Sequence, residues 1–226
     1  MRIFYSIFQY FNRQDKLLTS LLVSIGAAVC LLAARIVYSQ QFTFITLIWN
    51  LFLAYIPFFL SRTMKNNYQL QKPGLLSLSI AFTWLIFFPN APYILTDFFH
   101  LQEREGVPLW FDLIIIALFA WNGLIIGFLS LKDMQQMIAI KYGEKYGWTF
   151  TLLVILLGSF GIYIGRYLRY NSWDVFLAPY SLTTDILKIF LHPLHHKGAF
   201  GMTIGMAIFL MTSYYNFSRF YRISET

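Results

Sequence analysis

The feature that most constrains the fold of this chain is a series of six apolar runs, each about 20 residues long. A helix rises about 1.5 Å per residue, so each run would reach about 30 Å, which matches the hydrocarbon core of a membrane. Lipid cannot satisfy backbone amides and carbonyls, so such runs must be helical. The sequence therefore predicts an all-α bundle of six transmembrane helices, at residues 17–38, 42–61, 74–95, 111–131, 149–167 and 198–217.

Composition favours a membrane protein over a soluble one. Of the 226 residues, 58% are apolar and only 12% are charged, whereas soluble domains carry about 25% charged residues. The net charge of +7 does not indicate a nucleic-acid partner, because most Lys and Arg lie between the apolar runs. We expect membrane lipids as partners and one integral domain over residues 1–226. The single cysteine, Cys30, excludes an intrachain disulfide and a Cys-x-x-Cys metal site.

The distribution of Lys and Arg predicts the orientation. If the N-terminus lies inside, eleven of them fall on the inner side and six on the outer side, so both termini face the cytoplasm of a cell (cytoplasmic) membrane. All four histidines and six of the ten acids then lie outside. Either titratable chemistry is concentrated there, or outer loops carry the polar residues that spans exclude. Residues 1–16 are expected to form a short amphipathic surface helix and not a cleavable signal peptide.

The third apolar run ends in the segment FPNAPYILTDFFHL, residues 88–101. Pro89 and Pro92 each remove an amide donor and clash with the preceding turn. We therefore predict that the third helix breaks or kinks here, with Phe88 and Ala91 outside the helical region. Asn90 lies inside the break, where its side chain can cap freed carbonyls.

A short helix over 93–101 would place Asp97 and His100 three residues apart on one face. A carboxylate beside an imidazole orients the ring and raises its basicity, so both residues are candidate catalytic groups. The alternative is a polar pair at the membrane interface that satisfies only itself.

The fifth run ends in GIYIGRYLRYNSWD, which places Arg166 and Arg169 three residues apart among aromatic side chains. Two guanidinium groups on one face suit a phosphate or carboxylate, so these arginines are candidate anion-binding residues. Two alternatives remain. The arginines could extend to lipid phosphates without a specific ligand, or form ion pairs with Asp97 or Asp174.

The segment 174–197 is amphipathic, and we expect a helix near 181–191 that lies flat on the membrane. It is followed by HPLHHK, in which His192 and His196 are four residues apart, a spacing used by helical zinc sites. Pro193 should prevent a continuous helix between them. A site that also recruits His100 stays open, so metal and cofactor remain unassigned.

Polar and small residues within the runs predict helix contacts. Asn50 and Asn122 fall near the middle of the second and fourth runs, where an unpaired amide is costly, so we expect them to contact each other. Ionisable groups at mid-depth, which proton-coupled transporters usually need, are not apparent. Glycine pairs with three residues between them occur in the last three runs, at 123/127, 161/165 and 201/205. We expect these runs to pack tightly, or to form homo- or hetero-oligomers, through the glycine faces.

Three motifs, WNLFLAYIP (49–57), FPNAPYILTDFFHL (88–101) and GRYLRYNSWD (165–174), resemble those of a domain-of-unknown-function family of prokaryotic multi-pass integral membrane proteins. The resemblance extends over about residues 42–217 and implies a cytoplasmic-membrane protein without an established activity. The motifs contain Asp97, His100, Arg166 and Arg169, and also three residues expected to support the site, Asn90, Asn171 and Asp174. The HPLHH segment is not part of the resemblance.

Three functions fit these observations. An enzyme or lipid-binding protein would bring Asp97 and His100 together with the two arginines in an outer pocket for an anionic headgroup or envelope precursor. A small-solute transporter would line its path with the broken third helix and have a cavity at the level of Asn50 and Asn122. A structural or accessory subunit would pair its charges and have no pocket.

Overall fold

The computed structural model describes the backbone of residues 2–104 and 106–223, and the side chains of 19–104 and 106–221. No β-strand forms in this part of the chain. The helices are α1 (Arg2–Ser39), α2 (Thr46–Asn66), α3 (Tyr68–Gln71), α4 (Leu75–Phe87), α5 (Asn90–Tyr93), the 3-10 helix η1 (Ile94–His100), α6 (Leu109–Tyr142), α7 (Glu144–Tyr163), the π-helical turn η2 (Ile164–Leu168), α8 (Asp174–Leu177), α9 (Pro179–Leu191) and α10 (Lys197–Ile223).

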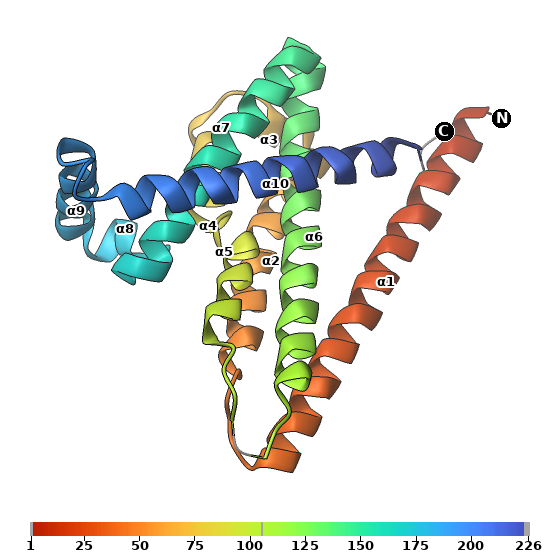
Figure 1. The fold of residues 1–226 in the computed structure, drawn as a ribbon. Coiled ribbons are helices and arrows are strands. Elements are labelled where there is room, and N and C mark those ends of the chain that lie inside the picture. Colours follow the sequence, from red (N-terminus) through yellow and green to blue (C-terminus); the bar gives the residue numbers. More distant parts are fainter. Residues whose placement is uncertain (1, 105, 224–226) are drawn as a thin grey trace.

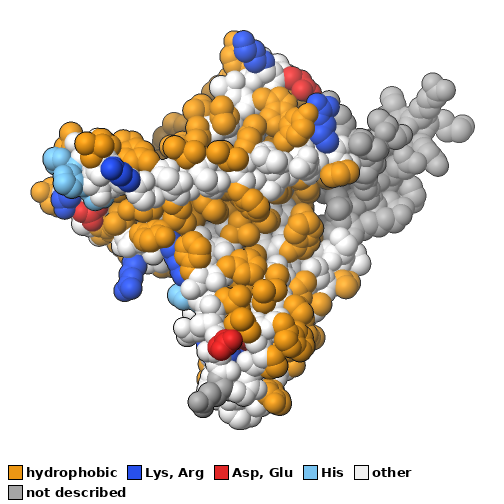
Figure 2. All heavy atoms as spheres, in the orientation of Figure 1, with side chains coloured by type: hydrophobic (Ala, Val, Ile, Leu, Met, Phe, Trp, Pro, Cys, Tyr) orange, Lys and Arg blue, Asp and Glu red, His pale blue; other side chains and the backbone are white. Residues whose placement is uncertain are grey.

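Six of the described helical stretches are long and apolar enough to cross a membrane, which confirms the predicted all-α six-span fold. They cover Thr19–Ser39, Thr46–Asn66, Leu75–His100, Leu109–Tyr142, Glu144–Leu168 and Lys197–Tyr221. Hydrophobic side chains cover much of the face in Figure 2, and the charged groups lie near its edges. The N-in/C-in orientation stays a prediction.

The helix α6 is the centre of the arrangement. It packs against α1, α2 and α7, and α7 in turn packs against α10, which runs crosswise over α6 and α7 in Figure 1. The helix α1 contacts α6 near the C-terminal end of α1, and it diverges from the bundle toward its N-terminal end in Figure 1. Because α1 is continuous from Arg2 to Ser39, the expected surface helix over 1–16 is not a separate element. Side chains up to residue 18 lie outside the described part.

Two charged clusters lie toward the ends of α6, and sequence reasoning missed both. The carboxylate of Asp112 is fully buried, and it accepts hydrogen bonds from Arg35 Nε at 2.6 Å and Arg104 Nη1 at 3.2 Å. The carboxylate of Asp133 forms ion pairs with Arg62 Nε at 2.8 Å and Lys65 Nζ at 2.6 Å. The two aspartates are 21 positions apart, about 31 Å of helix, so the clusters bracket a stretch as long as a hydrocarbon core.

The expected contact between Asn50 and Asn122 is wrong, although α2 and α6 do lie side by side. Asn50 Nδ2 donates to Asp97 Oδ2 at 3.0 Å, while Asn122 Nδ2 donates to the carbonyl of Leu118 in its own helix at 2.8 Å. The amide nitrogen of Asn122 is satisfied by its own preceding turn, so it needs no donor or acceptor from another helix. Asn122 Oδ1 is buried and has no hydrogen-bond partner among the described residues.

The helix α9 begins two residues before the predicted range and ends with it at Leu191. Its buried Ile189 packs against Tyr163 and Ala199, which attaches α9 to the end of α7 and the start of α10. The rest of α9 is mostly exposed, with Leu187, Phe190 and Leu191 among its open apolar side chains. The amphipathic pattern therefore correctly predicted this helix, and its flat placement on the membrane stays a prediction.

Candidate functional site

The double-proline segment keeps a helical path but changes its hydrogen bonding. Phe88 has right-handed helical dihedral angles (φ −54°, ψ −41°), so the expectation that it leaves the helical region is wrong. The amide of Ala91 donates to the carbonyl of Phe88 at 3.2 Å, as in a 3-10 turn, and the chain continues as a 3-10 helix from Ile94. The prolines thus interrupt the α-helical bonding, and the carbonyls of Ile86 and Phe87 need other donors.

Two side chains supply those donors. Asn90 Nδ2 donates to the carbonyl of Phe87 at 2.9 Å and to Ser172 Oγ at 2.8 Å. Ser172 Oγ donates to the carbonyl of Ile86 at 3.1 Å. Asn90 therefore lies where sequence reasoning placed it. Ser172 was missed, although it belongs to the NSWD motif, because nothing in the sequence linked that motif to the prolines.

Glycines of α6 and α7 hold the double-proline segment from two sides. A Cβ added at Gly123 would lie 2.7 Å from the carbonyl oxygen of Ala91, and one added at Gly127 would lie 2.8 Å from the Cβ of Ala91. One added at Gly161 would lie 2.7 Å from Pro89 Cγ. The last three spans do pack on one another, α7 against both α6 and α10, as predicted. The glycine faces of α6 and α7 are not what joins them, since these faces receive the third span instead.

The glycines of α10 behave differently. A Cβ at Gly201 or Gly205 would meet nothing within 4 Å among the residues that the structure describes. The predicted oligomer through glycine-lined faces thus depends on α10 alone and stays a prediction.

Arg166 lies between the two candidate catalytic residues. Its Nη1 is 2.8 Å from His100 Nε2 and 3.9 Å from Asp97 Oδ1, and its Cζ lies 5.3 Å from the centre of the Phe99 ring. The expected direct pair of Asp97 and His100 does not form, because the buried Asp97 carboxylate accepts from Asn50 instead. Since a guanidinium can only donate, His100 Nε2 must be the acceptor, and His100 is the neutral tautomer with its proton on Nδ1.

Arg169 follows the π-helical turn η2 and adopts a left-handed conformation (φ 62°). A π-turn inserts one extra residue per turn, which changes the direction of the side chains that follow it. Arg169 is exposed, and within the described part of the chain it has no carboxylate within 4.0 Å. Of the ion pairs considered for the two arginines, only the one between Arg166 and Asp97 is present.

The loop after Arg169 is fixed by two carboxylates. Asp174 Oδ2 accepts from the backbone amide of Asn171 at 2.6 Å, closing the turn that leads into α8. Asp185 accepts from Tyr170 Oη and from Lys188 Nζ, each at 2.9 Å, which ties α9 to the loop. The hydrogen bond from Lys188, followed by that from Tyr170, lowers the pKa of Asp185, and Asp185 raises the pKa of Lys188.

A cavity of about 950 Å³ connects these elements, and we call it the arginine cavity. Arg166, Arg169, His100, Asn50, Asn90 and Asn171 contribute its polar lining. Its apolar lining includes Leu53, Phe82, Leu85, Ile86, Leu157, Ile164, Val175, Leu182 and Ile186, from α2, α4, α7, η2, α8 and α9. Asp97 does not itself line the cavity, and it pairs with two residues that do, Arg166 and Asn50. The roles predicted for these residues stay predictions.

The histidines after α9 do not join this site. His192 and His195 have ring centres 6.3 Å apart, and His196 lies in the same turn. No group of three or more His, Cys, Asp or Glu that could hold a metal ion occurs in the described residues, so the three-imidazole arrangement with His100 is not formed.

Comparisons with characterised proteins and with solved structures found no match. A family described as a protein of unknown function (DUF1361) matches residues 49–213, a range that includes both the double-proline segment and the two arginines. The chain therefore belongs to this family, and it is a multi-pass membrane protein.

Proposed function

We propose that this protein binds an amphiphile with an anionic headgroup, such as an anionic lipid or a phosphorylated envelope precursor, in the arginine cavity. The observation that carries the proposal is the composition of that cavity. Two guanidinium groups and an imidazole lie in one cavity of about 950 Å³ whose other walls are largely aliphatic and aromatic. An amphiphile has the matching arrangement, with an anionic headgroup for the cationic residues and an apolar chain for the aliphatic and aromatic walls.

Arg169 is the residue best placed to meet a headgroup. It lines the cavity, it is exposed, and no described carboxylate neutralises it. A guanidinium presents a planar fork of donors that fits two oxygens of a phosphate or carboxylate. Charge-assisted hydrogen bonds of this kind contribute about 1.5–3 kcal/mol each.

Arg166 would act as the second contact. Its charge is partly balanced by Asp97 at 3.9 Å, and its Nη1 is oriented by His100. Asp97 is in turn oriented by Asn50. An arginine held in this way needs little reordering to accept a ligand, which lowers the entropy cost of binding.

The apolar walls suit the chain of the ligand. Phe82, Leu85 and Leu157 lie on α4 and α7, and Leu182 and Ile186 lie on α9. Covering such surface contributes roughly 25 cal/mol per Å² of apolar area removed from contact with water. The amphipathic helix α9 thus forms one wall of the cavity.

Processing of the bound ligand is a finer form of the same proposal. His100 would act as general base only after Arg166 turned toward the ligand, because Nε2 now accepts from that arginine. The transporter alternative has less support, since Asn50 lines the cavity but Asn122 does not. The accessory-subunit alternative does not account for a cavity with an unpaired arginine.

Native mass spectrometry of the detergent-purified protein tests the proposal. The wild type should retain an anionic lipid at a fixed ratio, and Arg169→Gln should weaken retention about tenfold or more, as loss of a charged hydrogen bond predicts. Lys197→Gln is the matched control, because Lys197 is an exposed cation at the start of α10 and does not line the cavity. Equal retention by Arg169→Gln and Lys197→Gln would contradict the proposal.

A further inference from the structure

We propose a second anion site, for a phosphate group, at the opposite end of α7 from the arginine cavity. A smaller cavity of about 260 Å³ lies where the start of α7 meets the last turns of α6 and α10. Glu144, at the start of α7, is 22 positions before Arg166, about 33 Å of helix, so the two cavities are separated by the length of a span. We call this second space the glutamine cavity, after Gln135 and Gln136 in its lining.

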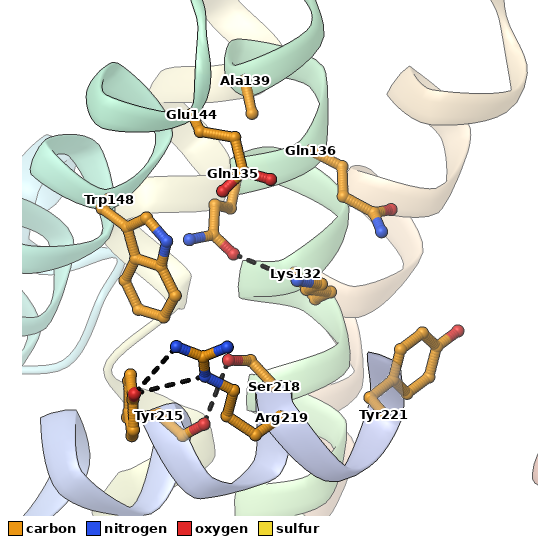
Figure 3. A pocket seen from close by; sticks show the side chains of 10 residues that line it. All are labelled: Lys132, Gln135, Gln136, Ala139, Glu144, Trp148, Tyr215, Ser218, Arg219 and Tyr221. Carbon is orange, nitrogen blue, oxygen red and sulfur yellow. Dashed lines mark hydrogen bonds between the residues drawn. The ribbon is translucent and has the colours of Figure 1, made fainter. Parts of the chain in front are cut away.

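The glutamine cavity is rich in hydrogen-bond donors. Arg219 and Lys132 supply two cations, and Figure 3 shows the guanidinium of Arg219 pointing toward the space between Tyr215 and Trp148. Arg219 donates through Nε and Nη2 to Tyr215 Oη, at 3.2 and 3.0 Å, and its Cζ lies 5.1 Å from the Tyr215 ring centre. In the part of the chain that the structure describes, Arg219 has no carboxylate within 4.0 Å.

Gln135 provides an independent indication of a ligand. Its side chain is buried at 4% exposure, and its Oε1 accepts from Tyr214 Oη at 2.6 Å and from Lys132 Nζ at 3.5 Å. Because Lys132 can only donate, Oε1 must face Lys132, and the amide Nε2 is left on the other side of the group. Nε2 has no hydrogen-bond partner among the described residues, and Figure 3 shows it directed into the cavity on the side of Trp148.

These donors favour an anion of small size. A fully ionised phosphate has several acceptor oxygens and no hydrogen to donate. It can therefore accept hydrogen bonds from Arg219, Lys132 and Gln135 together. The volume is suited to a headgroup or a small phosphorylated molecule and too small for an acyl chain as well. Glu144 also lines the cavity, and in Figure 3 its carboxylate lies on the other side of Gln135 from Arg219.

The phosphate could belong to a lipid headgroup or to a soluble molecule, and two measurements separate these sources. In the first, native mass spectrometry counts phosphatidylglycerol bound to protein released from nanodiscs. In the second, thermal unfolding in detergent is followed with inorganic phosphate and with glycerol phosphate. The variant is Arg219→Gln, with Arg219→Lys retaining the charge and Lys141→Gln as the control, because Lys141 is an exposed cation on α6 outside the cavity.

Arg219→Gln should lose about tenfold in apparent affinity in one of the two measurements, and that measurement identifies the source of the phosphate. Arg219→Lys should lie between the variant and the wild type, and Lys141→Gln should match the wild type. If Arg219→Gln binds lipid, phosphate and glycerol phosphate as the wild type does, the second site does not exist. That result would not affect the arginine cavity, which is tested with Arg169.

Discussion

Nη1 of Arg166 lies 2.8 Å from Nε2 of His100, and only one of the two nitrogens can accept a hydrogen bond. The contact therefore fixes the imidazole as a neutral acceptor and connects the third and fifth spans at the arginine cavity. It also lies beside Asp97, whose carboxylate is 3.9 Å from the same guanidinium nitrogen.

The tautomer can be observed directly. With ¹⁵N-labelled histidine at neutral pH, NMR should show one ring with a protonated Nδ1 and an Nε2 that accepts. In Arg166→Gln that ring should lose its fixed tautomer, since the donor that selects it is shortened and uncharged. The other histidines are His192, His195 and His196, which lie outside the cavity and should keep their signals. A His100 signal that is the same in both proteins would exclude the contact.

Asn90→Ala should destabilise the protein by about 1–3 kcal/mol, because the carbonyl of Phe87 and the hydroxyl of Ser172 each lose a hydrogen bond in a partly buried place. Thermal unfolding in detergent measures this. Asn216→Ala on the exposed side of α10 is the comparison and should change little. A similar small change for both variants would mean that the freed carbonyls do not depend on Asn90.

Gly161→Ala should be destabilising by about 1–3 kcal/mol, since the new Cβ would lie 2.7 Å from Pro89 Cγ, in a rigid ring. Gly201→Ala places the same methyl group where nothing lies within 4 Å among the described residues, so it should be neutral or stabilising. Both variants add one methyl group to a helical glycine, but only the methyl group at residue 161 would contact another helix. Equal shifts of the two unfolding temperatures would contradict the packing of α7 on the double-proline segment.

Arg35→Met should cost about 3–5 kcal/mol, because it leaves the fully buried carboxylate of Asp112 with only the longer contact to Arg104. Removing both members, as Arg35→Met with Asp112→Leu, should recover part of that loss, since no fully buried charge then lacks its partner and only the partly exposed Arg104 loses its contact to Asp112. The free energy of unfolding of the two single variants and the double variant gives the coupling. Additive losses would show that the two groups do not interact.

The apolar runs were sufficient to predict the helical class and the six spans, because length and hydropathy are local properties. Residues within one motif were also readable, as with Asn90, whose place between two prolines implies a capping role. Pairing across the chain was not readable. Arg35 and Asp112 are 77 positions apart, and the glycines of α6 and α7 serve the third span, which neither their spacing nor their number indicates.

The direct pair of Asp97 and His100 failed for a related reason. Spacing brought them to one face, but the burial of Asp97 required a strong donor, which Asn50 provides from another helix. The imidazole of His100 instead accepts a hydrogen bond from Arg166. The sequence thus identified side chains that do meet at this site, but it did not indicate which side chain bonds to which.

The two ion-pair clusters of α6 have a consequence for where the protein can reside. Asp112 and Asp133 lie about 31 Å apart on one helix. The cations that pair with them and stay partly exposed, Arg104 at one end and Arg62 and Lys65 at the other, cannot enter hydrocarbon without a desolvation cost. A bilayer thicker than this interval must thin around the molecule, and a thinner one must swell or accept a tilted helix. The spacing of the two clusters therefore sets the hydrocarbon thickness that fits this protein best. This preference would enrich the protein in membranes, or in lipid patches, of that thickness.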